Sequence, residues 1–223
     1  MIAAAGEPII GWKVARLPPA LAAQVGQAGI VGPIFASQRS DEAGASTVGI
    51  FTGGYGAGEA EFLLRLDSPP TRLDRSLSLH DAAAAIGSVQ VGVEVASSPI
   101  EEIVRLGVAA VASDFGINSG ILIGPEVTDW RNADLEAWMV STAVDGVEVG
   151  SGRADAFVGG LAGSVQILFA ALASRRHRLI EGQWVASGAV TGAHPLQAGQ
   201  VLRVDFGGRH EVSFVATPVV VAT

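Results

Sequence analysis

The sequence contains no cysteine and little positive charge. The missing cysteines exclude disulfides, a thiolate nucleophile and any cysteine-ligated zinc site. Fourteen lysine and arginine residues against 22 acidic residues give a net charge of −8. This balance argues against nucleic acid as a partner, because phosphate binding needs a basic surface.

Long hydrophobic runs are also absent. The apolar runs, such as Val165–Ala173, are far shorter than the ~20 residues that span a bilayer, so we expect no membrane partner. The first residues, MIAAAGEPII, lack the basic and apolar regions of a signal peptide. A cytoplasmic location is therefore the default expectation.

Several common catalytic motifs are missing as well. The chain has no GxGxxG, P-loop, GxSxG or HExxH motif, and its four histidines lie far apart. Thirteen of the fourteen basic residues are arginine, and Lys13 is the only lysine. Because burial can tune an ammonium while a guanidinium stays protonated, Lys13 is either a functional residue or a chance exception in an arginine-rich composition.

The residue pattern predicts a strand-rich α+β fold in a single domain, residues 1–223. Strands are expected at 7–15, 47–52, 59–66, 89–95, 121–123, 136–143, 147–149, 184–187, 201–206 and 211–216, helices at 17–24, 80–86, 98–112 and 160–176, and a turn-rich apolar segment at 29–36. Asp145-Gly146 predicts a tight hairpin. Hydrophobic residues make up 49% of the chain and charged residues 16%, so we expect a homo-oligomer that covers apolar surface.

A pair of acidic residues is the first candidate for chemistry. Glu59 and Glu61 lie two residues apart on a predicted strand, so both carboxylates share one face. Glu94 lies within the apolar segment VGVEVA, where an unpaired charge is costly, and can supply a third oxygen ligand. Three carboxylates without histidine or cysteine suit a hard divalent cation, Mg²⁺ or Mn²⁺. The alternative is that the pair lies on the solvated face of an edge strand.

Eight sequence segments, spread over nearly the whole chain, carry a further pattern. They are IIGWKVA (9–15), GPIFA (32–36), EAEFLLRL (59–66), VEVASSPI (93–100), SGILIGPEV (119–127), VDGVEVGSGRADAFVGG (144–160), GQWVASGA (182–189) and AGQVLRVDFGG (198–208). In their order and spacing the segments resemble the fumarylacetoacetate hydrolase superfamily, in its 2-oxopent-4-enoate hydratase and 4-oxalocrotonate decarboxylase branch. The resemblance implies a mixed β-roll with flanking helices, like the C-terminal domain of fumarylacetoacetate hydrolase.

The resemblance also implies roles for individual residues. A divalent metal would be held by Glu59, Glu61 and Glu94 and would bind a 2-oxo or 2-hydroxy acid, and Lys13 falls at the family's catalytic lysine. The remaining implied residues are Asp114, near the family's acidic ADN stretch, as a catalytic group, and Ser37, Ser151, Arg153, Ser187 and Gly188 as substrate contacts. Ser37 stands where the family usually has an acidic residue that assists proton transfer. The family's N-terminal helical segment has no counterpart, which implies a shortened, divergent member.

Three activities are compatible with these residues. The first is a metal-dependent hydratase that adds water to a 2-hydroxydienoate through a metal-stabilised enolate, as in the meta-cleavage catabolism of aromatic compounds. The second is a related decarboxylase, or another enzyme that cleaves a C–C bond, using the same enolate. The third is a non-catalytic homologue that binds a 2-oxo acid or scaffolds a partner enzyme. The lysine and the three glutamates favour an enzyme, because unused buried carboxylates carry a desolvation cost.

Overall fold

The computed structural model describes residues 6–41, 47–70 and 76–219. These residues form two sheets with few helices, which confirms the predicted α+β class. The larger sheet has the order β2 (Gly29–Phe35), β1 (Ile9–Arg16), β10 (Trp184–Ala186), β5 (Tyr55–Leu66), β6 (Ile86–Ser98), β7 (Asn118–Glu126) and β3 (Arg39–Asp41), with β11 (Ala193–Pro195) paired to β5. The smaller sheet has the order β4 (Thr47–Phe51), β13 (His210–Val219), β12 (Val201–Phe206), β8 (Val140–Val144) and β9 (Val147–Gly152).

The helices connect strands along the chain, and all of them except α4 are short. They are α1 (Pro19–Val25), α2 (Leu79–Ala84), α3 (Val108–Ser113) and α4 (Gly160–Ala173), together with the 3-10 turns η2 (Ala36–Gln38), η3 (Phe115–Ile117), η4 (Leu135–Ala137) and η5 (Ala154–Ala156). Among the described residues, no helix is long and apolar enough to cross a membrane.

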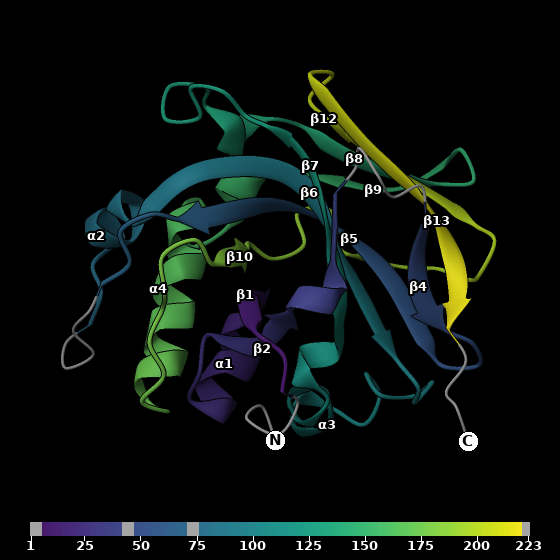
Figure 1. The fold of residues 1–223 in the computed structure, drawn as a ribbon, viewed down its shortest axis with the longest axis horizontal. Coiled ribbons are helices and arrows are strands. Elements are labelled where there is room, and N and C mark those ends of the chain that lie inside the picture. The colour runs from purple at the N-terminus through teal and green to yellow at the C-terminus, as the bar shows by residue number, and fades with distance from the viewer. Residues whose placement is uncertain (1–5, 42–46, 71–75, 220–223) are drawn as a thin grey trace.

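The larger sheet is rolled. Strands β2 and β3 stand at opposite ends of its order, yet only the three residues of η2 separate them in the chain. The sheet must therefore curl until its two edges meet, and β2 indeed lies against β7. Figure 1 shows the long strands β5 and β6 arching across the molecule, with α4 near one end of the arch and the smaller sheet near the other.

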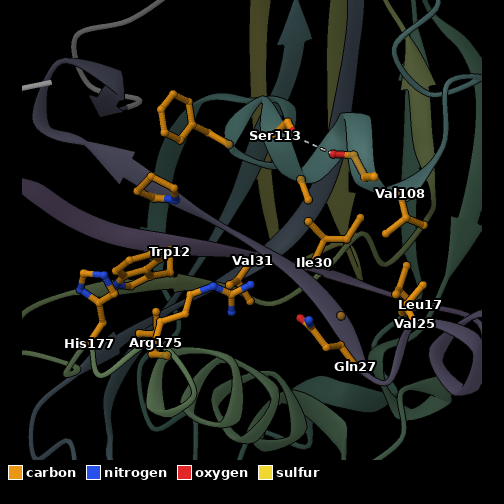
Figure 2. Close-up of a pocket in the computed structure, with 16 residues that line it drawn as sticks. Trp12, Leu17, Val25, Gln27, Ile30, Val31, Val108, Ser113, Arg175 and His177 are labelled. Carbon is orange, nitrogen blue, oxygen red and sulfur yellow. Dashed lines mark hydrogen bonds between the residues drawn. The ribbon is translucent and has the colours of Figure 1, made fainter. Parts of the chain in front are cut away.

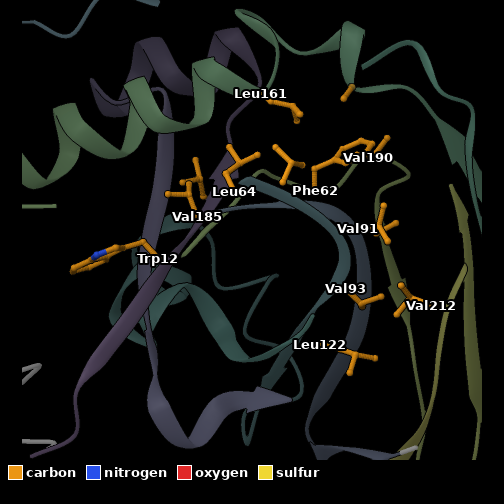
Figure 3. Close-up of a cluster of buried hydrophobic side chains, with 14 of the residues drawn as sticks. Trp12, Phe62, Leu64, Val91, Val93, Leu122, Leu161, Val185, Val190 and Val212 are labelled. Carbon is orange, nitrogen blue, oxygen red and sulfur yellow. The ribbon is translucent and has the colours of Figure 1, made fainter. Parts of the chain in front are cut away.

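Side-chain alternation gives this roll two different faces. On β5, the even residues such as Phe62 and Leu64 join the main core with α4 and the smaller sheet (Figure 3). The odd residues, which include Leu63, point to the other face, where Leu63 packs with Ile34 and Ile121 in a separate cluster. Because successive residues of a strand face opposite ways, Glu59 and Glu61 share the inner face with Leu63.

The structure differs from the predicted elements in several places, including two short strands, β3 and β11, where none was expected. Ser98 ends β6, because the pairing with β5 continues to Tyr55 opposite Ser98, so the helix expected from residue 98 begins only at Val108. The strand expected at 136–143 starts at Val140, after the turn η4. The segment expected to be turn-rich is β2. The predicted hairpin is confirmed, since residues 145 and 146 join β8 to β9.

Candidate active site

Three buried glutamates meet on the inner face of the roll. Glu59 on β5 lies directly opposite Glu94 on β6, and Glu61 follows on the same face of β5. One carboxylate oxygen from each of the three lies within 4.8 Å of the others. Glu61 and Glu94 are fully buried and Glu59 is 8% exposed. The alternative of a solvated strand face is therefore wrong.

Lys13 completes this cluster from β1. Its Nζ lies 2.9 Å from Glu94 Oε1, and its side chain is 2% exposed. Burial alone would lower the pKa of Lys13, but the negative charges of Glu94 and Glu59 outweigh burial and raise it. In the metal-free protein Lys13 is therefore a fixed cation within the cluster.

Asn118, at the start of β7, also holds Glu94. Its Nδ2 donates a hydrogen bond of 3.0 Å to the same oxygen, Oε1, that pairs with Lys13. Glu94 Oε1 thus has two donors, whereas Oε2 has no partner among the described residues. Glu61 shows the same pattern. Its Oε2 accepts a hydrogen bond of 2.9 Å from the Gly188 amide, and its Oε1 lacks a partner within the same set of residues.

These free oxygens test whether the cluster fits a metal. If all three carboxylates were ionised, the single ammonium would leave two negative charges in a buried space, and each charge is costly there unless it is paired. Burial and the neighbouring Glu94 raise the pKa of Glu59 to about 7, although Lys13 lowers it. Burial and the same neighbour also raise the pKa of Glu61. A hard divalent cation would supply the missing charge and the missing partners, so the donor set fits Mg²⁺ or Mn²⁺.

A second layer of contacts fixes the segment after β10. Ser187 is fully buried, and its Oγ accepts a bond of 3.1 Å from the amide of Phe62. The Ser187 carbonyl accepts from Arg16 Nε at 3.3 Å and from Ser164 Oγ at 2.6 Å. Gly188 has φ +99, a conformation that glycine adopts without strain. Ser187 thus orients the Gly188 amide that holds Glu61.

The turn around η3 covers Lys13 from the other side. A Cβ on Gly32 would lie 1.7 Å from the carbonyl oxygen of Phe115, so only glycine allows the turn to lie flat on β2. The next residue, Gly116, packs against the Lys13 side chain. Asp114 begins this turn, and its buried Oδ2 has no partner in the described part of the chain.

Three residues from the implied substrate site lie elsewhere. Ser37 is exposed, and its Oγ donates to Glu7 Oε2 at 2.8 Å. Ser151 and Arg153 are exposed at and just beyond the end of β9, in the smaller sheet. Within the described residues, none of the three side chains forms a hydrogen bond with the glutamate cluster, and their roles remain predictions.

Sequence reasoning missed Asn118, Arg16 and Ser164. One sequence signal could have pointed to Ser164, which is a serine within the otherwise largely apolar segment of α4; the structure shows its hydroxyl to be fully buried. Arg16 binds both Ser164 Oγ, at 2.7 Å, and the carbonyl of Gly160. These partners are more than 140 residues away in the chain, so no local pattern predicts them.

Comparison with known proteins shows which of them share this fold. Neither a family model nor a curated protein matches the sequence. Among solved structures, 4-oxalocrotonate decarboxylase from Pseudomonas putida G7, complexed with calcium and acetate, matches with TM-score 0.80 and 25% identity over 97% of this chain and 80% of that chain. The chain has the fold of the fumarylacetoacetate hydrolase superfamily.

Other solved members agree with that assignment. The same decarboxylase complexed with magnesium and adipate matches with TM-score 0.80 and 24% identity, over 97% of this chain and 80% of that one. Fumarylpyruvate hydrolase from Pseudomonas aeruginosa, in complex with Mn²⁺ and pyruvate, matches with TM-score 0.68 and 16% identity, over 96% of this chain and 91% of that one. The resemblance to this superfamily and to its decarboxylase branch is confirmed.

Proposed function

We propose that the chain is a Mg²⁺- or Mn²⁺-dependent enzyme that decarboxylates a small 2-oxo acid through its enolate. The observation that carries this proposal is the buried cluster of Glu59, Glu61 and Glu94, in which two carboxylate oxygens have no partner among the described residues. The calcium, magnesium and manganese complexes of the solved neighbours support the same assignment. A cytoplasmic location and a role in aromatic catabolism remain predictions.

The three glutamates would hold the cation. When bound, it would accept the carboxylate and the 2-oxo group of the substrate as ligands and would stabilise negative charge on the enolate oxygen. The protein contributes the alignment of the ligands: the Gly188 amide and the Asn118 amide group each engage one oxygen of a glutamate. In each case the other carboxylate oxygen stays free, so these two residues determine which carboxylate oxygens are available to bind the cation.

Lys13 supplies the second element of the chemistry. Its ammonium lies beside Glu94 in a site that burial keeps poor in water. There Nζ can stabilise the negative charge that develops when the C–C bond breaks, and it can donate the proton that the enolate carbon then takes up. The substrate must therefore carry a second carboxylate, conjugated with the 2-oxo group and not bound to the metal. This second carboxylate leaves as CO₂, and the electrons of the broken bond remain in the enolate.

Two observations support decarboxylation over hydration. The solved neighbour with 25% identity is a decarboxylase. Ser37 replaces the acidic residue that the family uses for proton transfer, and its hydroxyl is bonded to Glu7. Decarboxylation needs an electron sink and a proton donor, whereas hydration also needs a group that activates water. The residues in the cluster can provide the electron sink and the proton donor that decarboxylation needs.

Hydration of a 2-hydroxydienoate is the second candidate, and Asp114 favours it. Its Oδ2 is buried without a partner among the described residues, and the turn that it begins packs against Lys13. A free carboxylate in this turn is the type of group that hydration requires.

Product analysis distinguishes the candidates. The protein is incubated with Mn²⁺ or Mg²⁺ and, separately, with 2-oxohex-3-enedioate and with 2-hydroxypenta-2,4-dienoate. Release of CO₂ from the first substrate supports decarboxylation, and formation of 4-hydroxy-2-oxopentanoate from the second supports hydration. Metal-dependent binding of both acids without turnover would contradict the enzymatic proposal and favour a non-catalytic binding protein.

A further inference from the structure

A pocket of about 700 Å³, lined by none of the three glutamates, lies beside β1 and β2 (Figure 2). Its floor includes Trp12, the neighbour of Lys13 on β1, and Val31 of β2. Because successive residues of a strand face opposite ways, Trp12 faces this pocket while Lys13 faces the glutamates. The remaining walls come from α1, α3 and the end of α4.

The lining is mainly apolar, and Gln27 and Ser113 are its uncharged polar side chains. Trp12, Val25, Val31 and Leu172 contribute apolar surface, and the charged or titratable side chains are Arg175 and His177. Within the described parts of the chain, no aspartate or glutamate lines the pocket, although the whole chain carries a net charge of −8. The pocket therefore combines an apolar body with a positively charged end.

Arg175 is placed to receive an anion. Figure 2 shows its side chain extending from the end of α4 toward Val31. Its Nη1 donates to the Ala171 carbonyl at 2.8 Å, and none of the carboxylates in the described ranges forms an ion pair with it. A guanidinium presents a planar fork that matches a carboxylate.

We propose that this pocket binds an amphipathic monocarboxylate, with its apolar chain or ring against Trp12, Val31 and Leu172 and its carboxylate at Arg175. The volume lies within the range of about 300–1,000 Å³ that is typical of small-molecule sites, and such sites combine apolar walls with a few placed polar groups. The ligand is distinct from the 2-oxo acid substrate, because the glutamates contribute nothing to this pocket.

Octanoate is a suitable probe, and isothermal titration calorimetry is a direct measurement. The titration is run in EDTA, so that no metal at the glutamate cluster can bind the carboxylate. We expect saturable binding of one octanoate per chain with a dissociation constant on the order of 1 mM or tighter. 1-Octanol, which lacks the charge, should bind at least about tenfold more weakly, because hydrogen bonds to charged groups are the stronger ones.

Three variants locate the site. Arg175→Gln should weaken octanoate binding by about tenfold or more, whereas Arg178→Gln, which changes the same basic segment outside the pocket, should leave it unchanged. Ala112→Trp, on the exposed surface of α3 that lines the pocket, should abolish binding by filling it. Circular dichroism checks that each variant is folded.

Four results would overturn the proposal. They are the absence of saturable binding, equal affinity for octanol and octanoate, equal loss of affinity in Arg175→Gln and Arg178→Gln, and normal binding by folded Ala112→Trp. None of them concerns metal or turnover, so failure here is distinguishable from failure of the proposed enzymatic function.

Discussion

Replacing Asn118 by alanine tests how the third carboxylate is oriented. The Asn118 side chain is 7% exposed and donates a 3.0 Å hydrogen bond to Glu94 Oε1. Losing a buried hydrogen bond to a charged group costs about 1.5–3 kcal/mol. The same substitution removes Asn118 Oδ1, a buried acceptor without a partner in the described ranges. Removing this unpaired acceptor raises the free energy of unfolding by about 1–3 kcal/mol. The two effects nearly cancel, so the free energy of unfolding should fall by about 2 kcal/mol at most.

Metal affinity should respond much more strongly. Without Asn118, Glu94 keeps its contact with Lys13 but can rotate, so Oε2 is no longer directed into the cluster. Loss of a residue that orients a metal ligand typically weakens binding by about 10–100-fold. That range corresponds to about 1.4–2.7 kcal/mol of binding free energy. The Asn118→Ala protein should therefore be nearly as stable as the native protein and bind Mn²⁺ far more weakly.

Two measurements check this prediction. Urea unfolding of the metal-free protein gives the change in stability, and Mn²⁺ titration by calorimetry gives the affinity. Asn132→Ala is a matched control, because Asn132 is exposed and its Nδ2 bonds only to Asp129 within the described residues. If Asn118→Ala and Asn132→Ala bind Mn²⁺ with the same affinity, Asn118 does not orient Glu94 and the reasoning fails.

Four further predictions concern charge and assembly. Lys13→Arg should lower turnover by about 10²-fold or more while Mn²⁺ binding changes little; near-normal turnover would contradict a catalytic role, and loss of both folding and metal binding would indicate a structural one. In the metal-free protein the pKa of Glu59 is about 7, so below that pH protons compete with Mn²⁺ for this carboxylate. Mn²⁺ affinity should therefore fall by up to about tenfold for each unit by which the pH is lowered. Because this pKa lies above the ordinary value of 4.5, the folded metal-free protein binds more protons than the unfolded chain between these values, and its stability should decrease as pH rises through that window, as urea unfolding can measure. Light scattering at micromolar concentration should give a homo-oligomer, since Leu106 and Val158 are among several exposed apolar side chains, and a monomer would refute this.

The glutamates could be predicted from sequence because their signals are local. Period-2 alternation puts Glu59 and Glu61 on one face, and the apolar neighbours of Glu94 indicate a buried charge. The scarcity of lysine marks Lys13. Asn118 gives no such signal, because its importance comes from a contact with a residue 24 positions away on a neighbouring strand.

Two of the incorrect elements, the helix expected from residue 98 and the turn expected at β2, have a common physical cause, which is tertiary pairing. Ser98 and the proline that follows it have the local pattern of a helix start, but pairing with β5 holds Ser98 in a strand. In β2, Gly32 and Pro33 resemble turn residues. Yet Gly32 is needed for the close approach of Phe115, and proline is tolerated because β2 is an edge strand of its sheet.

The closure of the roll has a consequence for the order of folding. Glu59 and Glu94 are brought together by the pairing of β5 with β6, which are neighbouring strands in the chain. Lys13 comes from the beginning of the chain and the Gly188 amide from near its end, and contacts of such long sequence separation form slowly. An early intermediate would then hold the paired carboxylates without the ammonium that offsets their charge and without the amide that binds one of them. A divalent cation in the refolding buffer should relieve this repulsion, so we expect refolding to be faster with Mn²⁺ than with EDTA.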